Sequence, residues 1–133
     1  MSNKSQSGGV YMEQAEDDLL LVEAYGDGGF RMKGSRLEGS LYITADGFYP
    51  VACKTVADLT EADFDQMLSD DAKPEILLVG TGAKMQLLPV AIKKFLVEAG
   101  HVPDIMDTGA AARTFNVLRM EGRQVAALLL QVD

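Results

Sequence analysis

Cysteine and histidine are almost absent from this sequence, which has one of each in 133 residues. With Cys53 alone, the chain can form no internal disulfide and no cysteine-cluster metal site. With His101 alone, a histidine-rich metal site is excluded too, so we predict no bound metal. Cys53 lies in a β-prone run, which favours a buried, inert thiol, and its isolation fits a reducing, cytoplasmic compartment.

Basic residues are also scarce, with 12 lysines and arginines against 20 acids and a formal net charge of -8. Nucleic-acid binding needs a positive surface that displaces counterions, so we predict no nucleic-acid partner. The acids concentrate in the run from Asp58 to Asp71. Two interpretations of this run stay open, a solvated helix face and a surface that docks a basic partner.

Long hydrophobic runs are missing as well. The longest, Ile76–Val79 and Val125–Leu130, are too short to cross a bilayer, so we expect no membrane insertion. The first 17 residues are polar and show neither a signal-peptide core nor an arginine-rich transit pattern, which favours a cytoplasmic location. We expect a flexible polar tail over residues 1–17 and a single domain over residues 18–133.

The N-terminal half is expected to be all β. Glycines at short intervals follow a plausible strand at Leu19–Tyr25 and separate short β-prone segments. Leu41–Thr44 and Phe48–Cys53 flank an Asp46-Gly47 step, which is a strong hairpin signal.

The C-terminal half alternates helices and strands. Thr60 and Asp63 resemble a capping box that opens a helix over about Glu61–Leu68. After it, the predicted order is a strand at Ile76–Val79, a helix between Pro89 and Gly100, a strand at Val102–Met106, a helix from Thr108 to Gly122, and a strand at Val125–Leu130. This order predicts an α/β fold with a parallel β-α-β-α-β unit.

The first helix of this unit is expected to bury one apolar stripe, formed by Leu88, Ile92, Phe95 and Ala99. Pro103 in the next strand indicates an edge position or a strand start.

Two Thr-Gly steps are the main candidate binding feature. Thr81-Gly82 follows the first strand of the unit and Thr108-Gly109 follows the second. The carboxyl ends of parallel strands meet at one edge of the sheet, where open α/β sheets bind ligands. Free backbone N–H groups at a helix start favour an anion there.

Three polar residues lie in the first turns of the second helix. Arg113 can add positive charge, and Thr114 and Asn116 can orient a polar group. The sharper hypothesis is a small anionic ligand at this edge, and the simpler one is that Thr, Gly and Asp only cap helices. Gly80-Thr81-Gly82 lacks the further residues of a nucleotide-binding loop, so we predict no cofactor.

No catalytic residues are predicted. His101 follows Gly100 at a helix end, where a charged imidazole would suit the helix dipole. Arg119 and Arg123 form a small basic edge, for which pairing with Glu121 or the acidic run and self-association are the open alternatives.

Four motifs in fixed order carry a family resemblance: Leu77–Gly82 (LLVGTG), Leu88–Pro89, Met106–Asn116 (MDTGAAARTFN) and Glu121–Ala127 (EGRQVAA). With them the chain resembles the Mth938-like domain family, a domain of unknown function, from about Leu19 onward. The resemblance implies a central mixed sheet with flanking helices and an additional N-terminal β layer.

The resemblance implies no known reaction. Eukaryotic relatives include a mitochondrial assembly factor for respiratory complex I and a protein linked to adipocyte differentiation, and both are expected to act through protein partners. Relatives often have tyrosine where this chain has Phe115 and cysteine where it has Ala112. Any chemistry that needs those side chains is therefore excluded here.

Two functions follow from these observations. The first is a non-enzymatic interaction or assembly-factor-type protein with a protein partner, for which a homodimer is one form. The second is a small anionic-ligand binder or cryptic enzyme that uses the Thr-Gly edge. The resemblance and the missing catalytic set favour the first.

Overall fold

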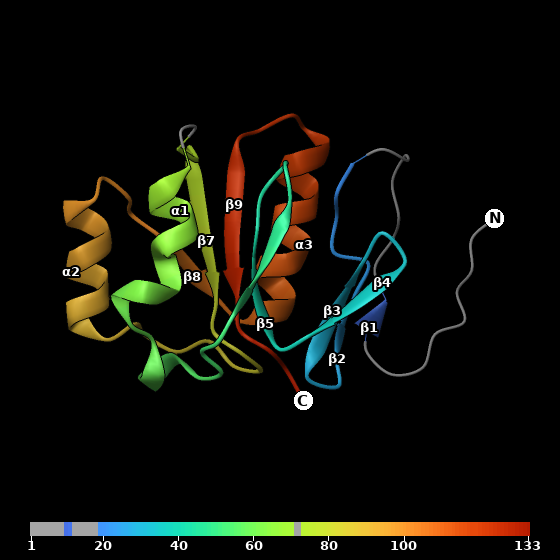
Figure 1. Cartoon of the computed structure of the whole chain (residues 1–133), viewed down its shortest axis with the longest axis horizontal. Helices are drawn as coiled ribbons and strands as arrows, with labels where there is room; N and C mark the ends of the chain where they lie inside the picture. The colour runs from blue at the N-terminus through green and yellow to red at the C-terminus, as the bar shows by residue number, and fades with distance from the viewer. Residues whose placement is uncertain (1–9, 12–18, 71–72) are drawn as a thin grey trace.

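Two β-sheets and three α-helices make up the part of the chain described by a computed structural model, residues 10–11, 19–70 and 73–133 (Figure 1). The expected tail lies mostly outside the described residues, and only Val10–Tyr11 within it are described, as strand β1. The division into a tail and one domain therefore stays a prediction.

The smaller sheet is antiparallel and has the order β1-β2-β3-β4. After β1 its strands are β2 (Ala24–Gly26), β3 (Gly29–Met32) and β4 (Ser35–Glu38). The strand predicted at Leu19–Tyr25 is thus wrong for residues 19–23, which precede β2. Leu20 and Val22 are nevertheless buried, because this segment packs on the core, and only Glu23 at its end donates a backbone hydrogen bond to β3, to the Arg31 carbonyl at 2.8 Å.

The larger sheet is mixed and has the order β6-β5-β9-β7-β8. Its strands are β5 (Ser40–Ile43), β6 (Phe48–Val51), β7 (Ile76–Gly80), β8 (Asp104–Met106) and β9 (Val125–Leu129). The predicted hairpin is confirmed, since β5 and β6 pair antiparallel and the Thr44 N–H donates to the Gly47 carbonyl at 2.9 Å. β7 runs parallel to both β8 and β9, as the β-α-β-α-β order predicts.

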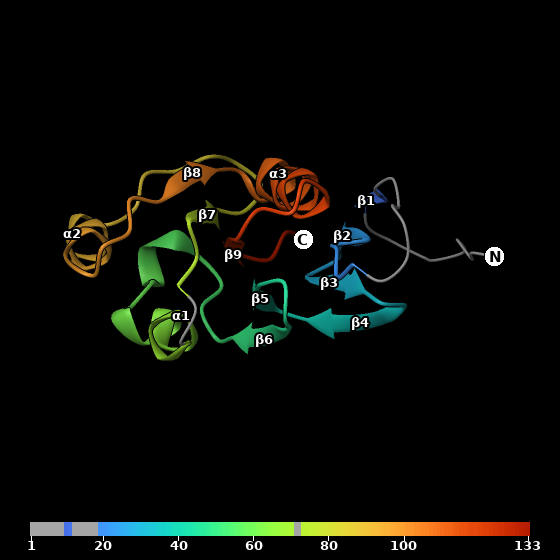
Figure 2. The same cartoon turned by 90° about the horizontal axis from the view of Figure 1, so that it is seen from above.

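Helices cover both faces of the larger sheet (Figure 2). α1 (Asp65–Ser69) and α2 (Val90–Glu98) pack on one face, and α3 (Thr108–Met120) packs on the other. Two short 3₁₀ turns, Val56–Asp58 and Glu61–Phe64, precede α1. The predicted capping residues are in place, because the Thr60 N–H donates to the Asp63 carboxylate at 2.8 Å.

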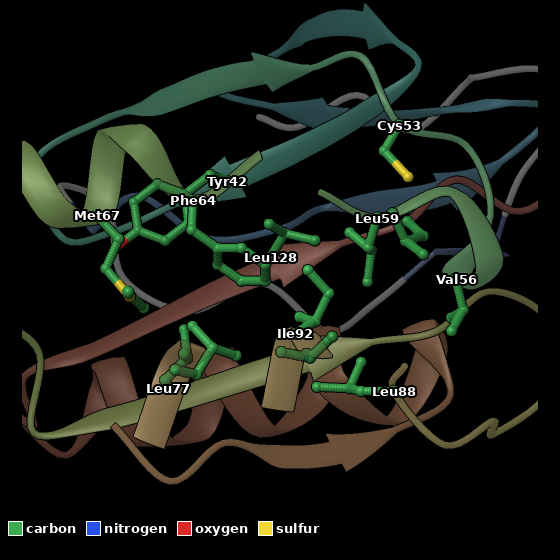
Figure 3. Close-up of a cluster of buried hydrophobic side chains, with 14 residues drawn as sticks. Tyr42, Cys53, Val56, Leu59, Phe64, Met67, Leu77, Leu88, Ile92 and Leu128 are labelled. Carbon is green, nitrogen blue, oxygen red and sulfur yellow. The ribbon is translucent and has the colours of Figure 1, made fainter. Parts of the chain in front are cut away.

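Each face of the sheet has its own apolar core. Tyr42, Phe64, Met67, Ile92 and Leu128 belong to the core under α1 and α2 (Figure 3). The other core joins the smaller sheet to α3, through side chains that include Phe30, Met32, Leu41, Phe115 and Leu129. β7 and β9 are buried on both faces, which explains their unbroken apolar sequences.

The apolar stripe predicted for α2 is partly wrong. Leu88 and Ile92 are buried as expected, but Leu96 completes the stripe and Phe95 is only partly buried. Ala99 is exposed because the helix ends at Glu98 and Ala99 caps it outside the packed face. β8 begins at Asp104, after Pro103, and forms the sheet edge.

Candidate functional site

The two Thr-Gly steps meet at the carboxyl ends of β7 and β8, as the sequence predicts. The Gly82 N–H donates to the Thr108 hydroxyl at 2.9 Å, and the Thr108 N–H donates to the Gly82 carbonyl at 2.9 Å. Because the two steps are hydrogen-bonded to each other, their polar groups connect the end of β7 to the start of α3.

Thr108 is buried, and its hydroxyl both accepts and donates a hydrogen bond. It accepts the Gly82 N–H and donates to the Leu130 carbonyl at 2.7 Å, so it connects three chain segments. The buried hydroxyl of Thr81 works similarly, because it donates to the Lys84 carbonyl at 2.7 Å and accepts the Gln86 N–H at 3.1 Å. Both hydroxyls thus hold the backbone of the turns that follow the strands.

Gly80, the last residue of β7, allows the start of α3 to approach the strand this closely. A Cβ at this position would lie 2.8 Å from the Thr108 Cα and 2.9 Å from its hydroxyl oxygen. Sequence reasoning gave Gly80 no such role, because the contact joins residues far apart in the chain.

The start of α3 is covered from two directions. Of Asp107 and Thr108, the two candidate caps of this helix, Asp107 is the cap, because its carboxylate accepts the Ala110 N–H at 2.8 Å. The Tyr25 hydroxyl lies over Gly109 so closely that a Cβ there would collide with it. The Thr108 and Ala110 N–H groups already have acceptors within the protein, which leaves fewer free donors for an anion at the helix start.

The predicted polar residues of α3 do not converge on one point. Asn116 is buried, accepts the Val22 N–H and donates to the Val22 carbonyl, both at 2.9 Å. Thr114 is half-buried and donates to the Met106 sulfur at 3.7 Å. Arg113 is exposed, one turn into the helix. Ligand binding at this edge stays a prediction, and among these three residues Arg113 is the one exposed to solvent.

Cys53 is buried, and its thiol donates to the Thr55 carbonyl at 2.9 Å, consistent with the inert side chain expected. Burial raises the pKa of this thiol and outweighs the Thr55 hydrogen bond, which lowers it, while Asp63 and Asp58 raise it further, so the reactive thiolate is disfavoured. His101 departs from the prediction of a charged helix-end imidazole. Burial, with Lys73 as a second cause, lowers its pKa and favours the neutral form.

Arg123 has a different partner from those predicted. Its Nε lies 3.7 Å from a carboxylate oxygen of Glu75, and both side chains are exposed. A pair of this kind contributes little to stability.

The outer surface of α2 and the segment before it expose several apolar side chains. Leu87 is 77% exposed, Val90 84% and Val97 48%, and these side chains line a shallow groove of about 590 Å³. Ile105 of the edge strand forms part of the groove, and Lys93 and Lys94 add charge to it. Val90 and Val97 are two turns apart on α2, on a face that the core does not use, and Leu87 lies in the segment just before the helix.

Sequence reasoning missed this surface, although a signal for it was present. α2 contains apolar residues on more than one face, because Ile92 and Leu96 fill the core while Val90 and Val97 point outward. A surface helix usually buries one apolar stripe, so exposed valines outside that stripe are more than the packing of α2 requires.

Comparisons with known proteins place this chain among others of the same fold. An uncharacterized protein of Rhodobacter capsulatus is 34% identical over 84% of each chain. A bovine protein named NADH dehydrogenase [ubiquinone] 1 alpha subcomplex assembly factor 3 is 28% identical over 91% of this chain. The match spans 66% of the bovine protein's own length.

Solved structures agree with the fold. A Bartonella henselae crystal structure, described as an outer membrane protein, is 38% identical with a TM-score of 0.79 and covers 86% of this chain and 97% of its own. A solution structure from Bordetella pertussis, described as an Mth938-like domain, is 30% identical with a TM-score of 0.72, over 90% and 92% of the two chains. Within residues 10–11, 19–70 and 73–133, no helix has the length and apolar character that a membrane span needs.

The model of a family described as protein of unknown function (DUF498/DUF598) matches residues 22–130. This range includes both Thr-Gly steps, α2 and α3. The chain therefore belongs to the DUF498/DUF598 family and has the Mth938-like fold.

Proposed function

We propose that this domain is a non-enzymatic binding protein of the assembly-factor type, which holds a protein partner against the outer face of α2. The observation that carries the proposal is the exposed apolar groove formed by Leu87, Val90 and Val97. Exposed apolar side chains that gather on one face supply the apolar centre that a protein interface needs.

The groove has the composition expected of a protein interface. Apolar side chains form its floor, and Lys93, Lys94 and Glu98 also line it. Burying each exposed Leu or Val completely contributes about 1.5–3 kcal/mol of apolar transfer free energy. Two lysines against one glutamate favour a partner segment with apolar side chains in its centre and acidic residues at its border.

The relatives support the same class of function. The bovine relative is named an assembly factor, which implies that it acts on other proteins. The aligned region covers 91% of this chain and 66% of the bovine protein, so the two proteins share this domain.

The test compares partner capture by three forms of the full chain expressed in its own cells. Val90→Glu/Val97→Glu places charge in the groove, and Val117→Glu is the matched control because Val117 is a 49% exposed valine on α3, on the other face of the sheet. Such surface changes alter the free energy of unfolding by only about 0.5 kcal/mol. We expect one partner protein to be retained by the wild type and by the control and to be lost by the double variant. The purified partner should bind the purified wild-type chain directly.

Two results would contradict the proposal. Equal capture by all three forms would place any partner elsewhere. Light scattering could also show that the wild type and the control are dimers and the double variant is a monomer. The groove would then be a contact between two copies of this chain.

We further propose a cytoplasmic location, supported by a single cysteine whose thiol is buried. The Bartonella relative is described as an outer membrane protein, so cell fractionation is the decisive measurement. Recovery of the wild-type protein in the membrane fraction after a salt wash would contradict this location.

A further inference from the structure

Tyr42, in the middle of β5, has a hydroxyl group with no hydrogen-bond partner among the described residues. Tyr42 is only 1% exposed, and its hydroxyl oxygen is buried. Figure 3 shows the Tyr42 ring next to Phe64 and Met67, in the core under α1. Buried polar groups without partners are uncommon and costly, so this one requires an explanation.

A pocket of about 250 Å³ lies beside this side chain. Its walls come from the β5–β6 turn, the end of α1 and the chain before β7 and β9, and its polar side chains include those of Thr44, Asp46, Asp70 and Gln124. This is the end of the sheet at which β7 and β9 begin, opposite the Thr-Gly edge. We call it the Tyr42 pocket.

The Tyr42 pocket is acidic. Asp46 and Asp70 line it, and the Gln66 amide donates to Asp70 Oδ1 at 3.0 Å, which orients that carboxylate. Burial raises the pKa of Tyr42, and Asp70 raises it further, so the hydroxyl stays neutral and can donate or accept.

Nearby basic groups have their own partners. The Lys73 ammonium donates to the Leu68 carbonyl at 3.0 Å, at the end of α1. Arg123 lies 3.7 Å from Glu75. Neither cation lines the pocket, so within the part of the chain that the structure describes Asp46 and Asp70 set its charge.

We propose that the Tyr42 pocket binds a compact cationic group with N–H donors, a guanidinium or primary ammonium, with Asp70 as its counter-charge and Tyr42 as an acceptor. Such a group supplies the missing partner of the Tyr42 hydroxyl and balances the carboxylates. A free small amine and a basic side chain on another protein present the same chemistry. The inference is independent of the α2 groove.

The experiment is a nuclear magnetic resonance titration of the full chain with three probes. Methylguanidinium is the cationic probe, and methylurea is its neutral counterpart of nearly the same shape. An acetylated and amidated Gly-Arg-Gly peptide presents the guanidinium as a side chain. We expect saturable amide shifts at Thr44, Asp70 and Gln124 with methylguanidinium and none with methylurea.

The peptide separates the two sources of the group. Binding at least as tight as that of methylguanidinium indicates a pocket open to a partner's side chain. Binding of methylguanidinium alone indicates a free small cation. Absence of saturable shifts with both cationic probes overturns the proposal.

Three variants locate the binding. Asp70→Asn and Tyr42→Phe each lose a bond to a charged ligand, which corresponds to roughly tenfold weaker binding or more. Asp65→Asn is the matched control, since Asp65 is exposed on α1 and outside the pocket. Tyr42→Phe should melt at the same or a higher temperature without probe, because it removes an unpaired buried hydroxyl. Unchanged affinity in both Asp70→Asn and Tyr42→Phe would overturn the assignment, whereas Val90→Glu/Val97→Glu should bind the probes normally.

Discussion

Thr108 shows at the scale of one residue why polar side chains near the sheet edge need not contact a ligand. Its buried hydroxyl joins the turn after β7, the start of α3 and the chain after β9. Thr108→Val leaves the Gly82 N–H and the Leu130 carbonyl without partners, at about 1–3 kcal/mol for each buried group. We expect chemical denaturation to show a loss of about 2 kcal/mol or more, while Thr108→Ser, which keeps the hydroxyl, loses clearly less. Equal losses in the two variants would contradict this role.

His101 provides a prediction on pH. Its pKa in the folded chain is below the ordinary 6.5, because burial and Lys73 disfavour the charged imidazole. The unfolded chain therefore takes up a proton first as the pH falls. Stability should be fully present above pH 6.5 and decline as the pH falls toward the folded pKa. Denaturation curves between pH 7.5 and pH 5.5 should show this slope, and His101→Gln should flatten it, whereas an unchanged slope would assign it to other groups.

Arg113 is the predicted residue that is still exposed and able to bind an anion. The Tyr25 hydroxyl and the Asp107 cap cover the start of α3, and Arg113 is exposed beside them. If a small anion binds there, phosphate or sulfate should raise the melting temperature of the wild type and not of Arg113→Ala. A shift that is equal in the two proteins would exclude Arg113 from any such site.

At the scale of elements, Asn116 connects α3 to a segment that belongs to no strand. Both hydrogen bonds of its side-chain amide are made with the Val22 backbone, so the segment before β2 is held against the helix. Asn116→Ala should destabilise the protein by about 2 kcal/mol or more, because a buried N–H and C=O lose their partners. Hydrogen exchange should accelerate at Val22 more than at Leu128 of β9. Uniform acceleration at both amides would show that the two segments unfold together.

The same elements show which parts of the fold could be predicted. The Asp46-Gly47 hairpin, the Asp107 cap and the β-α-β-α-β order follow from local signals within a few residues of each other. Asn116 and Val22 are 94 residues apart, and no local pattern reveals that pair. Gly80 and the Tyr42 pocket likewise depend on contacts between distant segments. The outer face of α2 was detectable in principle, from the excess of apolar residues over what one buried face requires.

At the scale of the whole molecule, two packed cores support an apolar face that nothing in the described chain covers. The core under α1 and α2 is complete with Ile92 and Leu96, so the fold does not need Val90 and Val97 for its packing. This separation between packed and exposed apolar residues is what the proposed binding function requires, and it allows the outer face to be changed without unfolding the protein.

The most direct test places a photo-crosslinking amino acid at one position of the full chain in living cells. Position 90 lies in the groove of α2, and position 117 lies on α3 as the matched control, both at exposed valines. We predict a discrete crosslinked product with a second protein from position 90, and none of that product from position 117. The same product from both positions, or a product that contains only this chain, would contradict the central claim that the outer face of α2 binds a protein partner.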